Sequence, residues 1–362
     1  MFSGRIIFIK TPDMRICWVI LLSFLLFIAS CKPSPTAGVQ DGSATPVGDY
    51  FAPQDSGVQT AGIRMIPIHT PAGDFRVWTK RIGHNPRIKV LLLHGGPAMT
   101  HEYMECFESF LPKEGFELIE YDQLGSFYSD QPKDSALWTV DRFVEEVEQV
   151  RKALGLTKDN FYLLGNSWGG LLAMQYALKY QENLKGLIIC NMMASCPDYG
   201  RYAANVLAKT MDPTILDTLR GIEARGDFSN PRYMALLIPN FYHQHICRLR
   251  EWPDPLNRAI NHVNGVVYTM MQGPSEFGIS GRLARWDIKD RLHEIKVPTL
   301  TVGARYDTMD PEHMRWMSTQ VAHGRYLFCP EGSHLAMWDD QEHFYPGVIG
   351  FIQDVDEGKF PG

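Results

Sequence analysis

The sequence predicts an α/β fold, in which a mostly parallel sheet has helices on both faces and carries an inserted helical cap. Short apolar runs alternate with amphipathic helical stretches, which is typical of a parallel sheet covered on both sides. One apolar run, residues 161–164, passes through a Gly-x-Ser-x-Gly turn into an expected helix at residues 171–179. The expected strands at residues 184–190 and 299–302 are separated by about 100 residues, whereas a parallel crossover needs only a dozen or more.

The composition is that of a globular enzyme. The chain has 362 residues, of which 45% are hydrophobic and 21% are charged, and this length suits one large domain or a core with an insert. The formal net charge is −6 and no basic block stands out, so nucleic acid is not expected as a partner.

The first thirty residues are predicted to be a signal peptide (residues 1–30). Lys10 and Arg15 precede an apolar run at residues 16–30, which is shorter than the about 20 residues of a membrane span. Small residues then precede Cys31, and this resembles the lipobox of bacterial lipoproteins, in which the signal is cut before a cysteine whose thiol is lipidated. A plain secretory signal and an uncleaved anchor are the alternatives.

Residues 31–60 are rich in Pro, Ser, Thr, Gly and Ala, as in a flexible tether. Together with Cys31 they predict a protein anchored through its lipid to a membrane of the bacterial cell envelope, outside the cytoplasm. An oxidising compartment permits a disulfide, but an odd number of cysteines leaves at least one thiol. We expect the later cysteines to be small core residues rather than metal ligands. They are Cys106, Cys190, Cys196, Cys247 and Cys329.

The core elements follow the tether in order. Alternating apolar and polar residues at 63–69 and 75–80 predict an antiparallel hairpin at a sheet edge, with its turn at Gly73 and Asp74. A helical period predicts a helix at residues 140–154. Further buried strands are expected at residues 89–93, 116–121, 184–190, 299–302 and 326–329.

The long interval before residues 299–302 predicts a cap domain at residues 194–288, with helical stretches at residues 203–225 and 233–250. The cap divides the core into two parts, residues 61–193 and 289–362. In hydrolases with a nucleophilic serine, such an insert covers the serine and shapes the substrate pocket.

Ser167 is the candidate nucleophile. A sharp strand-to-helix turn needs small residues on both sides of the serine, and Gly165 and Gly169 supply them. The serine would stand at a helix N-terminus, where partial positive charge stabilises a developing oxyanion.

The glycine pair in His94-Gly-Gly-Pro97 follows directly on the strand at residues 89–93. Glycines allow the backbone N–H groups to approach a ligand closely. In this architecture the loop supplies one donor of the oxyanion hole, and the residue after the nucleophile supplies the other. We therefore assign the two donors to Gly96 and Trp168, and expect His94 to shape the loop.

The remaining members of a catalytic triad are sought after the nucleophile, in the order Ser, acid, His. Asp307 follows the strand at residues 299–302, where a carboxylate can reach an imidazole. Asp310 competes with it, but Pro311 comes next, so Asp310 has the pattern of a helix N-cap. His334 lies in the loop after the last strand and is chosen as the general base.

Together these residues carry a resemblance to a known family. From Gly62 to its end, the chain resembles the proline iminopeptidase family of α/β-hydrolases. The matching motifs are His94-Gly-Gly-Pro97, Tyr121-Asp-Gln123 with Gly125, Gly165-Asn-Ser-Trp-Gly-Gly170, Gly273-Pro-Ser-Glu-Phe277, Gly303-Ala-Arg-Tyr-Asp307 and Gly332-Ser-His334.

The resemblance implies a serine aminopeptidase that releases an N-terminal residue, often proline, from small peptides through an acyl-enzyme, without a metal or cofactor. It implies that Ser167, Asp307 and His334 are nucleophile, acid and general base. One departure is Ala98, where the family usually has glycine. Its methyl group is expected to tighten the oxyanion loop.

Recognition of a free N-terminus requires a group that binds the ammonium and blocks longer substrates. A partly desolvated carboxylate in the cap would do both, because ion pairing strengthens away from water. The resemblance assigns this role first to Glu276 and second to Glu223, which fits a solvated helix end equally well. It also leads us to expect a glutamate near Ala235, where alanine would weaken amine binding. Two alternatives stay open: an esterase, lactonase or amidase on the same fold, and an inactive hydrolase-fold lipoprotein that only binds.

Overall fold

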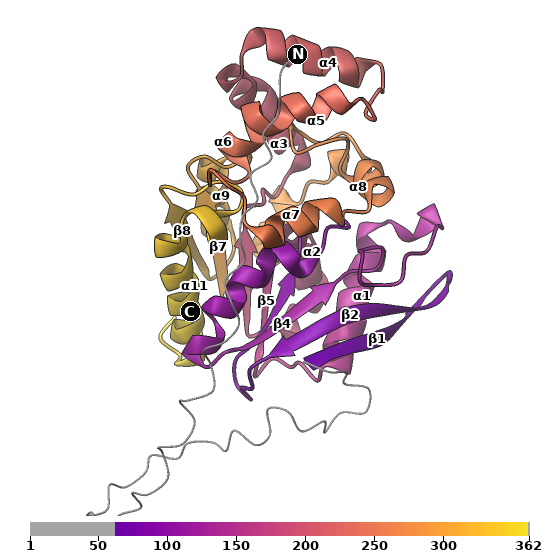
Figure 1. Ribbon diagram of the computed structural model, residues 1–362. Coiled ribbons are helices and arrows are strands. Elements are labelled where there is room, and N and C mark those ends of the chain that lie inside the picture. Colours follow the sequence, from indigo (N-terminus) through magenta and orange to yellow (C-terminus); the bar gives the residue numbers. More distant parts are fainter. Residues whose placement is uncertain (1–61, 361–362) are drawn as a thin grey trace, which may run out of the picture. The chain divides into compact units, whose positions relative to one another are not determined.

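The structure of the protein is a computed structural model that describes residues 62–360 (Figure 1). The predicted signal peptide, the tether and the candidate lipid site Cys31 lie outside these residues. Within residues 62–360, no helix combines the length and the apolar character that crossing a bilayer requires.

One eight-stranded sheet forms the core, in the order β1-β2-β4-β3-β5-β6-β7-β8. β1 pairs with β2 and β2 with β4 in antiparallel fashion, and all the other pairs are parallel. The mostly parallel sheet with an antiparallel edge is therefore confirmed. The strands are β1 (Ile63–Thr70), β2 (Gly73–Ile82), β3 (Lys89–Leu93), β4 (Glu117–Asp122), β5 (Phe161–Asn166), β6 (Gly186–Cys190), β7 (Thr299–Ala304) and β8 (Gly324–Cys329).

The hairpin turn lies slightly earlier than expected. Thr70 pairs with Gly73, so the turn consists of Pro71 and Ala72 rather than Gly73 and Asp74. The Thr70 side chain closes it, because its hydroxyl donates to the Gly73 carbonyl at 2.8 Å and accepts from the Ala72 N–H at 3.2 Å.

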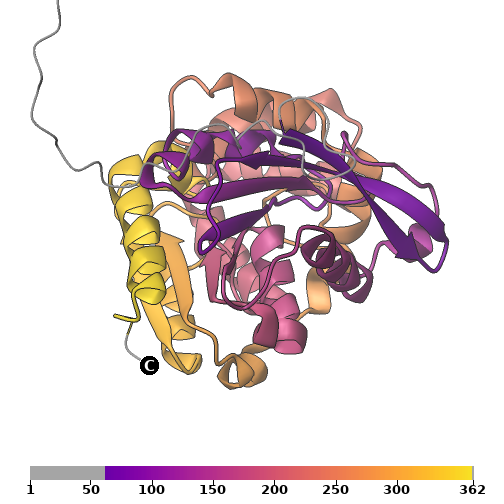
Figure 2. The same ribbon diagram turned by 90° about the horizontal axis from the view of Figure 1, so that it is seen from below.

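Helices cover both faces of the sheet, as Figure 2 shows from below. The helices α1 and α2 pack against each other, and α2 lies on β5 and β6 while α9 lies on β7. A second group, formed by the 3₁₀ helix η3 with α10 and α11, packs together and reaches β8 through α11. The bounds are η3 (His101–Ser109), α1 (Val140–Ala153), α2 (Trp168–Tyr180), α9 (Pro311–Gln320), α10 (Ala336–Asp339) and α11 (Gln341–Asp356).

The chain between β6 and β7 forms a set of short cap helices, of which α4 and α5 lie at the top of Figure 1. The cap helices are α3 (Cys196–Asn205), α4 (Pro213–Ala224), α5 (Pro231–Leu237), α6 (His243–His245), α7 (Asp254–Asn261) and α8 (Gly265–Met271), with the short helical turns η7 (Leu207–Thr210), η8 (Ile238–Tyr242) and η9 (Arg282–Arg285). The turn η10 (Lys289–Glu294) follows the predicted cap and contacts α9.

The two long cap helices predicted from the sequence are wrong in extent. Residues 203–225 break before Pro213, because proline suits only the first turn of a helix and Asp212 caps the new one by accepting from the Thr214 N–H. Residues 233–250 lose their helix after His245. The carbonyls of His245 and Ile246 instead accept from the N–H groups of His334 and Leu335, each at 2.9 Å.

The five cysteines within residues 62–360 are free thiols and all are buried. This confirms the expectation of small core residues. Burial raises the pKa of the Cys196 and Cys247 thiols to about 12. They are therefore unreactive at neutral pH.

Candidate active site

Ser167 stands on a sharp turn between β5 and α2. Its backbone has φ 57° and ψ −127°, a combination that residues other than glycine rarely adopt. The flanking glycines are required by space, since a Cβ on Gly165 would lie 2.0 Å from the Gly169 carbonyl oxygen, and one on Gly169 would lie 1.9 Å from the Leu93 oxygen. The Ser167 N–H donates to the Cys190 carbonyl at 3.0 Å, which fixes the turn to β6.

Asp307 and His334 meet at the carboxyl ends of β7 and β8. The His334 Nδ1 lies 2.7 Å from the Asp307 Oδ1, and the two residues are only 3% and 1% exposed. Burial opposes a charge on His334, but the Asp307 carboxylate, through its charge and its hydrogen bond, and the Glu276 carboxylate together raise the imidazole pKa above its ordinary value.

The second nitrogen of this imidazole, Nε2, is buried and has no hydrogen-bond partner among the described residues. Because Asp307 occupies Nδ1, Nε2 is the nitrogen that can accept a proton. The structure shows no hydrogen bond between Nε2 and the Ser167 hydroxyl. In serine hydrolases, such bonds are often long before substrate binds and tighten afterwards.

The expected oxyanion loop lies against the nucleophile. A Cβ on Gly95 would lie 2.9 Å from the Ser167 Cβ, so only glycine allows this approach. The Gly95 N–H is already used, since it donates to the Tyr103 hydroxyl at 2.6 Å. The N–H groups of Gly96 and Trp168 have no hydrogen-bond partner within residues 62–360, which leaves them available as the predicted donors.

Two further predictions about individual residues agree with the geometry. His94 shapes the loop, because its Nδ1 contacts the Gly95 oxygen at 2.8 Å and its Nε2 accepts from the Gln123 N–H at 3.1 Å. Burial lowers the pKa of His94, which keeps the ring neutral. Asp310 caps α9 by accepting from the Glu312 N–H at 3.0 Å, as its sequence context predicts.

Asn166 and Asn191 hold the site together, and sequence analysis missed both. The Asn191 amide donates to the Asp307 Oδ2 at 2.7 Å, and its backbone φ of 54° points to a special role. Asn166 accepts from the Tyr103 hydroxyl at 2.9 Å and donates to the His334 carbonyl at 3.4 Å. An asparagine at the carboxyl end of a buried strand is the signal that would have identified each, since Asn166 is the last residue of β5 and Asn191 directly follows β6.

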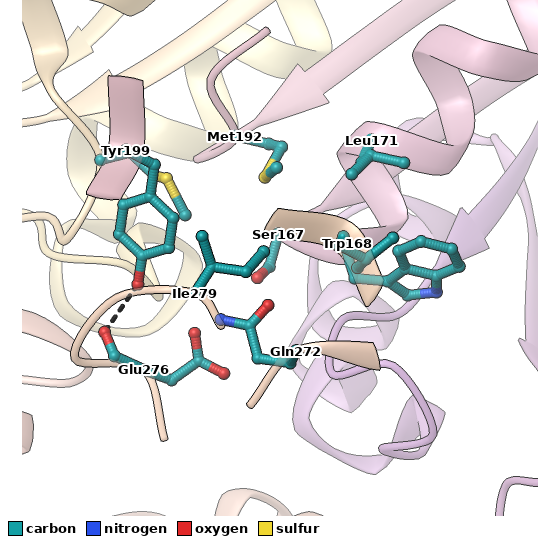
Figure 3. A pocket seen from close by; sticks show the side chains of 10 residues that line it. Ser167, Trp168, Leu171, Met192, Tyr199, Gln272, Glu276 and Ile279 are labelled. Carbon is teal, nitrogen blue, oxygen red and sulfur yellow. Dashed lines mark hydrogen bonds between the residues drawn. The ribbon is translucent and has the colours of Figure 1, made fainter. Parts of the chain in front are cut away.

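Glu276 is the cap carboxylate that faces the serine. It lines one small cavity together with Ser167, and Figure 3 shows Met192 on one side of Ser167 and Glu276 with Gln272 on the opposite side. The other walls of the cavity are mainly apolar and include Leu171, Met192, Ile279, Leu283 and Met309.

Tyrosines surround Glu276. Tyr268 donates to its carboxylate, Tyr199 donates to its backbone carbonyl at 2.7 Å, and its N–H donates to the Tyr242 hydroxyl at 3.1 Å. Burial raises the pKa of this carboxyl, although His334 and the Tyr268 hydrogen bond partly oppose the shift. Glu276 forms no ion pair among the described residues, so it is a buried acid without a cation.

The structure does not bring Glu223 to the serine. Glu223 lines a second cavity on the cap with Arg220 and Phe228, and it accepts from the Tyr233 hydroxyl at 2.6 Å. The Tyr233 hydroxyl in turn accepts from the Ser275 hydroxyl at 2.9 Å, so Glu223 reaches the loop of Glu276 only indirectly. Ala235 is exposed on α5 and lines neither cavity, so a glutamate there would not meet a ligand at Ser167.

Comparisons with known proteins agree with this geometry. A family model described as the alpha/beta hydrolase fold matches residues 89–341. A proline iminopeptidase of Flavobacterium johnsoniae is 71% identical over 295 residues, which cover 82% of this chain and 99% of the relative. A proline iminopeptidase of Elizabethkingia meningoseptica is 68% identical over 298 residues, which cover 82% of this chain and 100% of the relative.

A solved structure has the same fold. The crystal structure of a proline iminopeptidase from Mycobacterium smegmatis matches with a TM-score of 0.71 at 28% identity, and the match covers 81% of this chain and 99% of that one.

Proposed function

The chain belongs to the proline iminopeptidase family of α/β-hydrolases, and we propose that it releases an N-terminal proline or small apolar residue from peptides with Ser167 as nucleophile. The observation that supports this most is a cavity lined by both the strained Ser167 and the buried Glu276. It is joined by the pair of His334 with Asp307, in which the imidazole Nε2 has no partner among the described residues.

The proposed reaction has two steps. Ser167 attacks the first peptide carbonyl, and His334 takes the hydroxyl proton and passes it to the departing amine. The N–H groups of Gly96 and Trp168 bind the oxyanion that forms on the carbonyl oxygen. Water, activated by the same histidine, then hydrolyses the acyl-enzyme and regenerates the serine.

In this proposal Glu276 binds the substrate's ammonium group. A buried carboxylate without a cation gains most from a charged partner, since the surroundings are poor in water. The apolar walls around Leu171, Met192 and Leu283 suit a proline ring or a small apolar side chain next to that ammonium.

The test uses proline and alanine anilides as substrates. We expect Ser167→Ala to lose at least about a thousandfold in kcat, since removal of a nucleophile disables the whole triad. The matched control is Ser318→Ala on α9, whose hydroxyl only bonds the Arg315 carbonyl at 2.7 Å, and it should retain normal activity. Near-normal hydrolysis by Ser167→Ala would refute the mechanism.

Two additional assays separate the alternatives. A fluorophosphonate probe should label the wild-type protein and not Ser167→Ala, whereas an inactive binding protein would not react. A preference for short acyl esters over free-amine peptides, by a hundredfold or more in kcat/KM, would instead assign an esterase or lactonase to the fold.

We also propose that Cys31 carries a lipid that anchors the enzyme in the bacterial cell envelope. The support is the apolar run ending in Ile28-Ala-Ser-Cys31, followed by the tether at residues 31–60. Radiolabelled fatty acid should enter the wild-type protein in cells and not Cys31→Ser. Equal incorporation in both would exclude lipidation at this cysteine.

A further inference from the structure

The oxyanion loop is held at its first residues by the core. The Gln123 side-chain amide donates to the His94 carbonyl at 3.0 Å, and the Gly95 N–H donates to Tyr103. The Trp168 indole N–H in turn donates to the Gln123 side-chain oxygen at 2.7 Å. The core therefore fixes His94 and Gly95 relative to the helix that begins at Trp168.

The later residues of the loop are held by the cap. The Asn264 N–H, at the start of α8, donates to the Ala98 carbonyl at 3.0 Å. The Asn264 side-chain amide donates to the Gly125 carbonyl at 2.9 Å, while its oxygen caps α8 by accepting from the Val267 N–H at 3.4 Å. One cap residue thus connects a helix start with two loops of the core.

The preceding helix α7 reinforces this connection. Arg258 contacts Glu102 at 3.0 Å and Glu105 at 2.7 Å, and His262 contacts Glu102 at 2.7 Å. Glu102 is only 1% exposed, and it lies two residues after Thr100, the last residue of the loop. These contacts therefore attach the α7–α8 connection to the segment that directly follows the oxyanion loop.

The loop needs such support because its local conformation is unfavourable. Gly96 has φ 111° and Ala98 has φ 60°, a left-handed conformation in which a Cβ is disfavoured. Gly96 lies between Gly95, which the core holds, and Ala98, which the cap holds. No group within the described residues bonds the Gly96 N–H. The direction of that N–H therefore depends on both attachments.

We propose that Asn264 is a positioning residue through which the cap aligns the Gly96 N–H with the oxyanion at Ser167. This inference rests on the proposed function, in which Gly96 is an oxyanion donor. The cap then has a part in the chemical step as well as in substrate binding. The contact with Ala98 is made by the Asn264 backbone N–H, and the Asn264 side chain holds that N–H in place through its bonds to Gly125 and Val267. Loss of the side chain should therefore weaken transition-state stabilisation more than substrate binding, because the oxyanion exists only in the transition state and the tetrahedral intermediate.

The first test is Asn264→Ala, measured on proline anilide. We expect kcat to fall by about tenfold or more, less than for deletion of an oxyanion donor, with KM changed less than about twofold. The matched control is Asn230→Ala, because Asn230 caps another cap helix, α5, by accepting from the Arg232 N–H at 3.0 Å, and does not contact the oxyanion loop. The control should retain kcat.

A second variant guards against simple unfolding. Asn264→Ser keeps an oxygen that can cap α8 but removes the amide donor to Gly125, so it should fold and still lose kcat. The affinity for a prolyl boronate, which forms a tetrahedral adduct with the serine, should fall by the same factor as kcat in both Asn264 variants. The affinity for free proline should not change.

The outcomes separate this inference from the proposed function. Equal kcat in the wild type, Asn264→Ser and Asn230→Ala would overturn the positioning role while the aminopeptidase assignment stands. Unchanged boronate affinity in both Asn264 variants would do the same. If wild-type protein neither cleaves the anilide nor binds the boronate, the proposed function itself fails.

Discussion

The two halves of the site are built on different physical grounds. In the core half, Ser167, Asp307 and His334 are placed by strand ends and by backbone geometry, and Asp307 is held by Asn191 at 2.7 Å. In the cap half, Glu276 is a buried acid whose charged form lacks a cation. The core half is thus ready for any acyl substrate, whereas the cap half is completed by a substrate with a positive charge.

This difference indicates that the core half determines the type of reaction and the cap half determines the selectivity for substrates. Changes in the core half should reduce the rate for all substrates alike. Changes in the cap half should discriminate between substrates with and without a free amine. The predictions below test this division, from the largest expected effect to the smallest.

Asp307→Asn should have the largest effect, a loss of about a thousandfold or more in kcat on every substrate, because asparagine cannot stabilise the imidazolium of His334. The matched control is Asp310→Asn, since asparagine also caps helices well and should leave kcat and stability near normal. Steady-state kinetics on an anilide and on an ester check both variants. A strong loss in Asp310→Asn alone would exchange the roles of the two acids.

Asn191→Ala should reduce kcat/KM by roughly tenfold to a hundredfold, since it removes a hydrogen bond to a buried carboxylate that contributes about 1.5–3 kcal/mol. The loss should be equal for amine and N-acylated substrates, because Asn191 acts on Asp307 and not on the substrate. A loss confined to free-amine substrates would contradict the assignment of Asn191 to the core half.

The pH dependence should shift when the charge on Glu276 is removed. His334 must be neutral to act as base, so activity rises with pH through its pKa, which Glu276 helps to raise. In Glu276→Gln, the acid limb of kcat/KM for an N-acetylated ester should therefore move to lower pH. A limb that stays in place would show that the two groups do not interact, and an upward shift would contradict the sign of the interaction.

Ala98→Gly should have the smallest effect. Glycine relieves the left-handed strain at φ 60° but increases the freedom of the unfolded chain, so we expect a gain of at most about 1 kcal/mol in the free energy of unfolding. Ala224→Gly, at the exposed end of α4, should instead lose up to about 1 kcal/mol. Denaturant unfolding checks both, and destabilisation by Ala98→Gly would contradict the strain.

The core could be predicted from the sequence because its signals are local. The edge hairpin is marked by alternating apolar and polar residues and the later strands by short apolar runs, and Asp307 and His334 were identified by the strand that precedes each of them. Asn191 could not be assigned in this way, since it lies 116 positions from its partner Asp307 and no local pattern connects them.

The cap was harder to predict because parts of it form hydrogen bonds with the core instead of continuing their own helices. The composition of the residues after His245 favours a continued helix. The carbonyls of His245 and Ile246 instead accept hydrogen bonds from the loop that carries His334. Glu276 was found through a motif, but its three tyrosine partners come from three separate cap segments, α3, η8 and α8. Ala235 was expected at the amine site and is exposed instead, because helix α5 begins at Pro231 and turns that position outward.

The most direct test of the division between the halves is the substrate dependence of Glu276→Gln. The account predicts a KM for proline anilide that rises by tenfold or more, as expected for a lost charged contact of about 1.5–3 kcal/mol. An N-acetylated ester of the same size should be little affected, and the control Glu223→Gln should leave both substrates unchanged. Equal losses on the anilide and the ester in Glu276→Gln would contradict the account, because Glu276 would then support the cap and not the ammonium.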